Sequence, residues 1–177
     1  MARFTLHAVA PNRPGIVAAV TQSLAEIGCN LEDSRMYLLH GQFSIVLVLD
    51  APSTSSGTAI EMALAPHLEE LALQLFVRPI AEEHDEIDLD SLVSISVQGA
   101  DHPGTVARIA RAITTAGGNI VDLVGHVAPE DVEAPSHLEL TAELEHDAVP
   151  GLQTALDALV VELGMRCEVR EAAARPV

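Results

Sequence analysis

The sequence contains two copies of one pattern, and this repeat limits the possible folds more than any other feature. Pro14 and Gly15 recur as Pro103 and Gly104, 89 residues later. The same offset relates Val17/Val106, Gly28/Gly117, Asn30/Asn119 and Asp33/Asp122. A constant offset without a gap from Pro14 to Asp33 is not expected by chance. The chain of 177 residues is therefore two copies of one module.

Hydrophobic periodicity gives the same order of elements in both copies. In the first copy, the strands are predicted at 4–9, 30–39, 42–49 and 73–77. One helix follows the turn at 11–14 and ends at Gly28, and a second follows Ile60, with Pro66 expected to kink or divide it. In the second copy, apolar spacing predicts helices around 106–113 and 152–163 and strands at 93–97, 120–127, 137–144 and 165–169.

Both copies therefore read β-α-β-β-α-β, and the predicted fold class is α+β, with two ferredoxin-like modules in tandem. The predicted domains are module 1 at 1–80, an acidic linker at 81–91, module 2 at 92–172 and a tail at 173–177. The linker holds six carboxylates, which repel one another and favour a solvated segment.

The charge balance excludes several classes of protein. There are 26 acidic residues against nine basic ones, all of them Arg, for a net charge of −17. Direct nucleic-acid binding is not expected, because phosphate contacts need a basic cluster and base stacking needs aromatic side chains. Anionic membrane surfaces are disfavoured for the same reason. Without a signal peptide or a long apolar segment, the protein is expected to be cytoplasmic.

The turns carry a resemblance to a known family. A strand, Asn-Arg-Pro-Gly at 12–15, an amphipathic helix and Gly-Cys-Asn-Leu at 28–31 together resemble an ACT domain. Asp-His-Pro-Gly at 101–104 with Gly-Gly-Asn-Ile at 117–120 looks like a second one. The tandem layout is similar to the glycine cleavage system transcriptional repressor group. The resemblance implies binding of a small ligand, usually an amino acid, between paired modules.

The resemblance also implies the site residues. In related serine-binding domains, the turn Asn and the Asn that opens the second strand hold the ligand, and these match Asn12 and Asn30. Those domains also use a His where Ala10 and Gly99 stand here. The candidate ligand-binding residues are Asn12, Arg13, Pro14, Gly15, Ile16, Asn30, Leu31, Asp101, His102, Gly104, Thr105, Asn119 and Ile120. A carboxylate at Asp101 would repel a ligand carboxylate, so any second site needs another binding pose.

The chemistry of a free amino acid suits these residue types. Amide groups at the start of the first helix attract a carboxylate, and Gly15 lets the backbone approach closely. Asn amides offer a donor and an acceptor to either end of the zwitterion. The turns are equally consistent with tight strand-to-helix connections, and the Asn residues with tolerance of left-handed backbone. Glycine, serine and alanine are the first ligands to test, since the turn is expected to leave little room.

The predicted function is a non-catalytic amino-acid-binding regulator that acts through protein contacts. A homo-oligomer, a dimer, is expected, and a transcription regulator is a candidate protein partner. The alternatives are an oligomerising scaffold without ligand or an enzyme on a ferredoxin-like fold. No cofactor, metal site or catalytic residue is expected, because the eight His residues lack metal-ligand spacing and no nucleophile adjoins a base. Cys29 and Cys167 are expected to be buried as small apolar groups.

Overall fold

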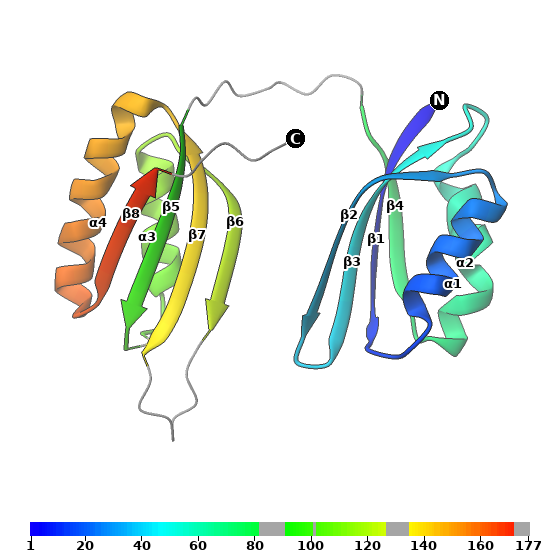
Figure 1. The fold of residues 1–177 in the computed structure, drawn as a ribbon, viewed down its shortest axis with the longest axis horizontal. Coiled ribbons are helices and arrows are strands. Elements are labelled where there is room, and N and C mark those ends of the chain that lie inside the picture. The colour runs from blue at the N-terminus through cyan, green and yellow to red at the C-terminus, as the bar shows by residue number, and fades with distance from the viewer. Residues whose placement is uncertain (82–90, 101, 127–134, 172–177) are drawn as a thin grey trace. The chain divides into compact units, whose positions relative to one another are not determined.

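The computed structural model describes residues 1–81, 91–100, 102–126 and 135–171. The chain divides into two units, Met1–Asp85 and Glu86–Val177, each with the order β-α-β-β-α-β (Figure 1). This confirms the predicted tandem ferredoxin-like fold. Most of the predicted linker, Asp101, the connection at 127–134 and the predicted tail lie outside the described residues. Ser91, which was predicted to end the linker, instead opens a strand of module 2.

The two central strands of module 1 bury every second residue, whereas its edge strands are more exposed. Its elements are β1 (Ala2–Pro11), α1 (Ile16–Glu26), β2 (Asn30–Leu39), β3 (Gln42–Ala51), α2 (Gly57–Glu70) and β4 (Gln74–Pro79). Gly15 and Gly28 flank α1 with φ angles of 96° and 78°, a left-handed conformation that glycine adopts without strain. Ser56 caps α2, because its hydroxyl accepts a hydrogen bond of 3.2 Å from the Ala59 amide.

Module 2 repeats this plan. Its elements are β5 (Ser91–Gly99), α3 (Thr105–Thr115), β6 (Asn119–His126), β7 (Ser136–Leu144), a 3₁₀ turn (His146–Ala148), α4 (Val149–Leu163) and β8 (Arg166–Glu171). Gly104 and Gly117 take the left-handed conformation at the positions of Gly15 and Gly28. The repeat therefore extends to the backbone angles at both ends of the first helix.

Each module is one antiparallel sheet with both helices on the same face (Figure 1). The strand orders are β2-β3-β1-β4 and β6-β7-β5-β8, so β2 and β6 are edge strands. The registers of β2 on β3 and of β6 on β7 both shift once near the start, between Leu31 and Asp33 and between Ile120 and Asp122.

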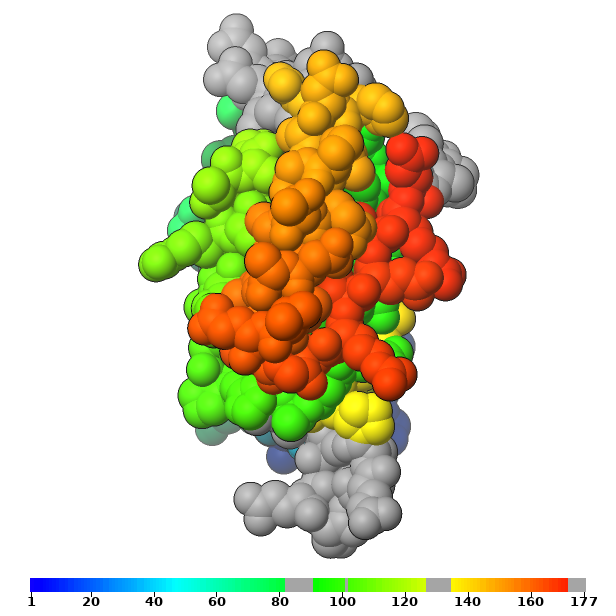
Figure 2. Space-filling model, turned by 90° about the vertical axis from the view of Figure 1, so that its left-hand side faces the viewer, coloured from blue at the N-terminus to red at the C-terminus, as the bar shows by residue number. Residues whose placement is uncertain are grey.

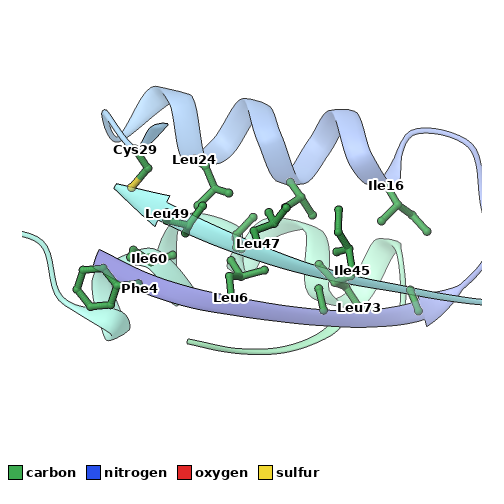
Figure 3. Close-up of a cluster of buried hydrophobic side chains, with 14 of the residues drawn as sticks. Phe4, Leu6, Ile16, Leu24, Cys29, Ile45, Leu47, Leu49, Ile60 and Leu73 are labelled. Atoms are coloured by element: carbon green, nitrogen blue, oxygen red, sulfur yellow. The ribbon is translucent and has the colours of Figure 1, made fainter. Parts of the chain in front are cut away.

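Each module has its own hydrophobic core between its sheet and its helices. In module 1, Leu6, Leu47 and Leu49 from the sheet point toward Leu24 and Ile60 from the helices (Figure 3). In module 2, Ile95 and Leu140 face Ile109 and Leu156 in the same way. Because the two sets of buried residues are separate, each module has a core of its own.

Two local predictions need correction. Pro66 neither divides α2 nor ends it, since the helix runs from Gly57 to Glu70 with Pro66 inside it. Cys29 is buried as predicted, but Cys167 is only half-buried, because it lies on the edge strand β8.

Candidate functional site

The turn between β1 and α1 is exposed to solvent, and one backbone hydrogen bond joins it to the neighbouring hairpin. The backbone N–H of Asn12 donates a hydrogen bond of 2.8 Å to the Gly41 carbonyl at the tip of the β2–β3 hairpin. Gly15 has a φ of 96°, and a Cβ built on it would meet no atom within 4 Å. The backbone at Gly15 is therefore accessible, and this turn lies beside the hairpin tip.

The first turn of α1 presents amide donors. Its first described helical bond runs from the Ala19 amide to the Gly15 carbonyl, 2.9 Å. The amides of Ile16, Val17 and Ala18 precede that bond, and no side chain caps this end of the helix. Acidic residues are absent from this first turn. These donors and the positive end of the helix dipole together favour an anion.

A cavity of about 490 Å³ opens over this helix end. It is polar at the turn and apolar along the inner face of β2 and β3, and it has no acidic lining residue. Its lining residues are Asn12, Arg13, Gly15, Ile16, Val17, Ala18, Met36, Leu38 and Phe43. The volume lies within the range of about 300–1,000 Å³ typical of small-molecule sites. It offers more room than the sequence suggested.

The structure places four of the predicted residues in this cavity: Asn12, Arg13, Gly15 and Ile16. Arg13 also has a structural contact, because its guanidinium donates a hydrogen bond of 3.2 Å to the Glu70 carbonyl at the end of α2. Pro14 is exposed in the same turn but does not line the cavity.

Asn30 and Leu31 lie elsewhere in the module. Asn30 pairs with Asp50 at the start of the hairpin, whereas Leu39, beside the turn, pairs with Gln42. Nine residues of strand separate the two ends, which is about 30 Å at 3.3 Å per residue. Asn12 and Asn30 of one module therefore cannot contact the same small ligand. Leu31 is half-buried against the core.

The corresponding cavity of module 2 is much smaller, about 70 Å³. Thr105 lines it, but its hydroxyl already donates a hydrogen bond of 2.9 Å to the His102 carbonyl. Met165 also lines it and packs so closely against Gly99 that a Cβ there would lie 2.8 Å from the Met165 Cγ. Residue 10, the counterpart of Gly99, is an alanine in module 1.

The other predicted residues of module 2 that the structure describes do not line this cavity. His102 and Gly104 are exposed in the turn. Asn119 pairs with Glu143 at the end of the sheet far from the turn, and Asn30 occupies the same place in module 1. Ile120 packs against the core.

The apolar wall of the module 1 cavity was not predicted from the sequence. Met36, Leu38 and Phe43 share the inner face of the β2–β3 hairpin, and Leu38 pairs with Phe43. The available signal was the presence of Met36 and Leu38 at alternating positions of a predicted edge strand. Their role depends on the turn and helix that they face.

Three further properties bear on the chemistry of the chain. Among the described residues, no group of three or more His, Cys, Asp or Glu side chains is arranged to hold a metal. Every helix in the described ranges falls short of the length and hydropathy that a membrane span requires. Burial raises the pKa of the Cys29 thiol beside Asn30, and the carboxylate of Asp50 adds to this effect.

Known proteins share this architecture. The solved structure of an unknown protein from Galdieria sulphuraria matches 97% of this chain and 99% of its own, with a TM-score of 0.82 at 22% identity. A proposed glycine cleavage system transcriptional repressor of known structure matches 97% of both chains, with a TM-score of 0.72 at 20% identity. Both likenesses concern the fold.

Sequence comparison identifies the family. The model of the ACT domain matches residues 4–78. The glycine cleavage system transcriptional repressor of Escherichia coli (strain K12) is 31% identical over 161 residues, which cover 89% of this chain and 84% of the repressor. The chain therefore belongs to the ACT domain family, as a two-module relative of the glycine cleavage system transcriptional repressor.

Proposed function

We propose that this protein is a cytoplasmic, non-catalytic regulator that binds a small amino acid in module 1 and acts through contacts with other proteins. The observation that carries this proposal is the cavity over the start of α1, with amide donors at one end and apolar walls. The relationship to a transcriptional repressor supports a regulatory role over the alternatives of an enzyme or a ligand-free scaffold.

The amides of Ile16, Val17 and Ala18 would receive the α-carboxylate of the ligand, because they precede the first helical bond. The Asn12 side chain would add a donor or an acceptor at the same end. None of the lining residues is acidic, so the cavity offers the ligand ammonium no opposite charge. One module alone therefore binds only part of a zwitterion.

A second copy of module 1 would complete the site. When two β2 edges pair antiparallel, the start of one strand lies beside the end of the other. That arrangement brings Asn30 of one copy toward the turn that holds Asn12 of the other. The Asn30 side chain is exposed and available for such a contact. The proposed ligand therefore binds between two protein molecules.

Thermal unfolding with added amino acids tests ligand binding. Glycine, serine and alanine should each be tried first, and at least one should raise the melting temperature. A ligand at a hundredfold excess over its Kd stabilises the folded protein by about 2.7 kcal/mol, a shift of a few degrees.

Substitutions then locate the site. Asn12→Ala and Asn30→Ala should each remove most of the shift and leave the unliganded melting temperature nearly unchanged, since both residues are exposed. Asn119→Ala is the matched control at the same repeat position and should retain the shift. Loss of the melting-temperature shift in Asn12→Ala but not in Asn30→Ala would place the site within one module. A wild-type protein that responds to no amino acid would contradict the proposal.

Self-association through β2 is the second expectation. This edge strand exposes Met36, Tyr37, Leu38 and Leu39, and the exposed fraction of Leu39 is 65%. Edge strands with apolar side chains pair readily, and a lysine placed on them blocks pairing. Sedimentation should show a dimer at tens of micromolar for the wild type and a monomer for Leu39→Lys. Val161→Lys, on an apolar residue of α4 that is also well exposed, should remain a dimer. A monomeric wild type would contradict this arrangement.

A further inference from the structure

Module 2 carries a groove that the ligand site does not use. It lies between α3 and α4 and has a volume of about 620 Å³. Figure 2 looks onto this face, with α4 in orange beside α3 in light green. The lining residues are Arg108, Arg111, Ala112, Thr115, Ala116, Ala148, Gly151, Leu152, Ala155 and Leu159.

The groove is shaped by small side chains at helical spacing. Ala112 and Ala116 are four residues apart on α3, and Gly151 and Ala155 are four residues apart on α4. Residues at this spacing lie on one face of a helix, so both helices present small residues to the groove. Packed helices lie about 8–10 Å apart where the contact residues are small. The space therefore fits one turn of a third helix carrying a larger aliphatic side chain.

Positive charge is concentrated at this groove in an otherwise acidic protein. The chain has nine basic residues, all Arg, and a net charge of −17, yet Arg108 and Arg111 both line the groove. Arg108 pairs with Glu162 of α4. Arg111 is exposed, and no ion pair of its side chain occurs among the residues that the structure describes. The groove thus offers a guanidinium group to a negatively charged partner.

Module 1 provides an internal comparison, since it has the same fold 89 residues earlier. Ala19 and Gln22 stand where Arg108 and Arg111 stand in module 2. Ser23, at the position of Ala112, hydrogen-bonds to His67 of α2 across a distance of 3.1 Å. The fold therefore requires neither the two arginines nor an alanine at this place. These differences belong to the surface of module 2 and not to its architecture.

We propose that the groove between α3 and α4 binds an acidic amphipathic helix of a partner protein. An aliphatic side chain of the partner inserts between Ala112 and Ala155, and a flanking carboxylate pairs with Arg111, since Arg108 is already paired with Glu162. Such helix-in-groove contacts combine apolar anchors with charge complementarity. The proposal rests on the proposed regulation by protein contact and names the surface and the chemistry of that contact.

Two designed peptides test this assignment by fluorescence anisotropy with the full chain. Both have about 18 residues, long enough for a helix, and share leucines on one face. One carries glutamates beside the leucines and the other lysines. The acidic peptide should bind in the micromolar range, at least about tenfold tighter than the basic one, and more weakly as salt is added.

Variants of the groove separate its two features. Arg111→Glu should weaken acidic-peptide binding at least about tenfold, and Ala155→Phe should do the same by filling the groove. Gln22→Glu, which places the same carboxylate at the matched position of module 1, should bind as the wild type does. Residues 111 and 155 are exposed, so both variants should keep the melting temperature of the wild type.

Several results would overturn the proposal. These are equal binding of both peptides, no binding of the acidic one at millimolar concentration, or wild-type binding by Arg111→Glu. Loss of the dimer in Ala155→Phe would instead assign the groove to a second copy of the chain. Asn12→Ala should bind the peptide normally, so a failure of the amino-acid site and a failure of this surface give different results.

Discussion

At the residue scale, equivalent positions of the two modules have different packing needs. Residue 118 is a glycine, and a Cβ there would lie 2.9 Å from the Ile113 Cγ2. Its counterpart in module 1 is Cys29, which is buried in the core (Figure 3). The two modules therefore share a backbone pattern, but the volume of the side chain at a matched position differs with the neighbours that it packs against. The same kind of difference makes the cavity of module 2 smaller, where Met165 packs against Gly99.

Cys167 provides a test of burial through pH. Desolvation, together with the charge of Asp157, raises the pKa of its thiol from 9.0 to about 11. The contribution of the neutral Cys167 thiol to folding stability is therefore fully present below pH 9 and is lost as the pH rises through 11. Urea unfolding should therefore show a smaller loss of stability between pH 8 and about 11 for Cys167→Ala than for the wild type. Equal losses would mean that the thiol is solvated. Cys29 is unchanged in both proteins and cancels in the comparison.

At the scale of the element, α2 tolerates a proline that a helix normally excludes. Pro66 lacks the amide that would bond to the Met62 carbonyl, and it lies on an exposed face. Amphipathic packing therefore holds the helix together: Ile60 and Leu64 are fully buried on one side. The sequence rule predicted a kink or a break, and the break does not occur, since α2 is continuous from Gly57 to Glu70.

Pro66→Ala should consequently stabilise the protein. Restoring the hydrogen bond and removing the clash of the proline ring are together worth up to about 3 kcal/mol, and the freer unfolded chain opposes this gain by about 0.4–1 kcal/mol. We expect a net gain of about 1–2 kcal/mol in urea unfolding. Pro150→Ala is the control, because proline in the first turn of α4 has no hydrogen bond to restore. A Pro66→Ala variant no more stable than the wild type would show that α2 is already adapted to its proline.

At the scale of the whole molecule, charge decides which partners are accessible. The net charge of −17 repels phosphate backbones, and several arginines are already paired, including Arg3 with Glu32 and Arg170 with Glu168. The purified protein should therefore not retard duplex DNA in a gel at physiological salt. Specific binding tighter than micromolar would replace regulation by protein contact with direct binding to DNA.

Much of this molecule could be predicted from its sequence. The offset of 89 residues showed two modules, and apolar spacing predicted every helix and strand of both to within a few residues. These features are local or repeated, so they can be predicted from the sequence without knowledge of tertiary contacts. The turn at Asn12 and Gly15 was also predicted to form part of a candidate site, and both residues line the same cavity in the structure.

Tertiary structure alone decided how the parts of the site relate to one another. In the sequence, Asn12 and Asn30 flank one helix, but they lie at opposite ends of the sheet, because the helix between them carries the chain back along the module before β2 begins. The cavity of module 1 and the groove of module 2 depend on side-chain volumes that meet across separate elements. Such volumes leave no local pattern in a sequence, since each is set by neighbours distant along the chain.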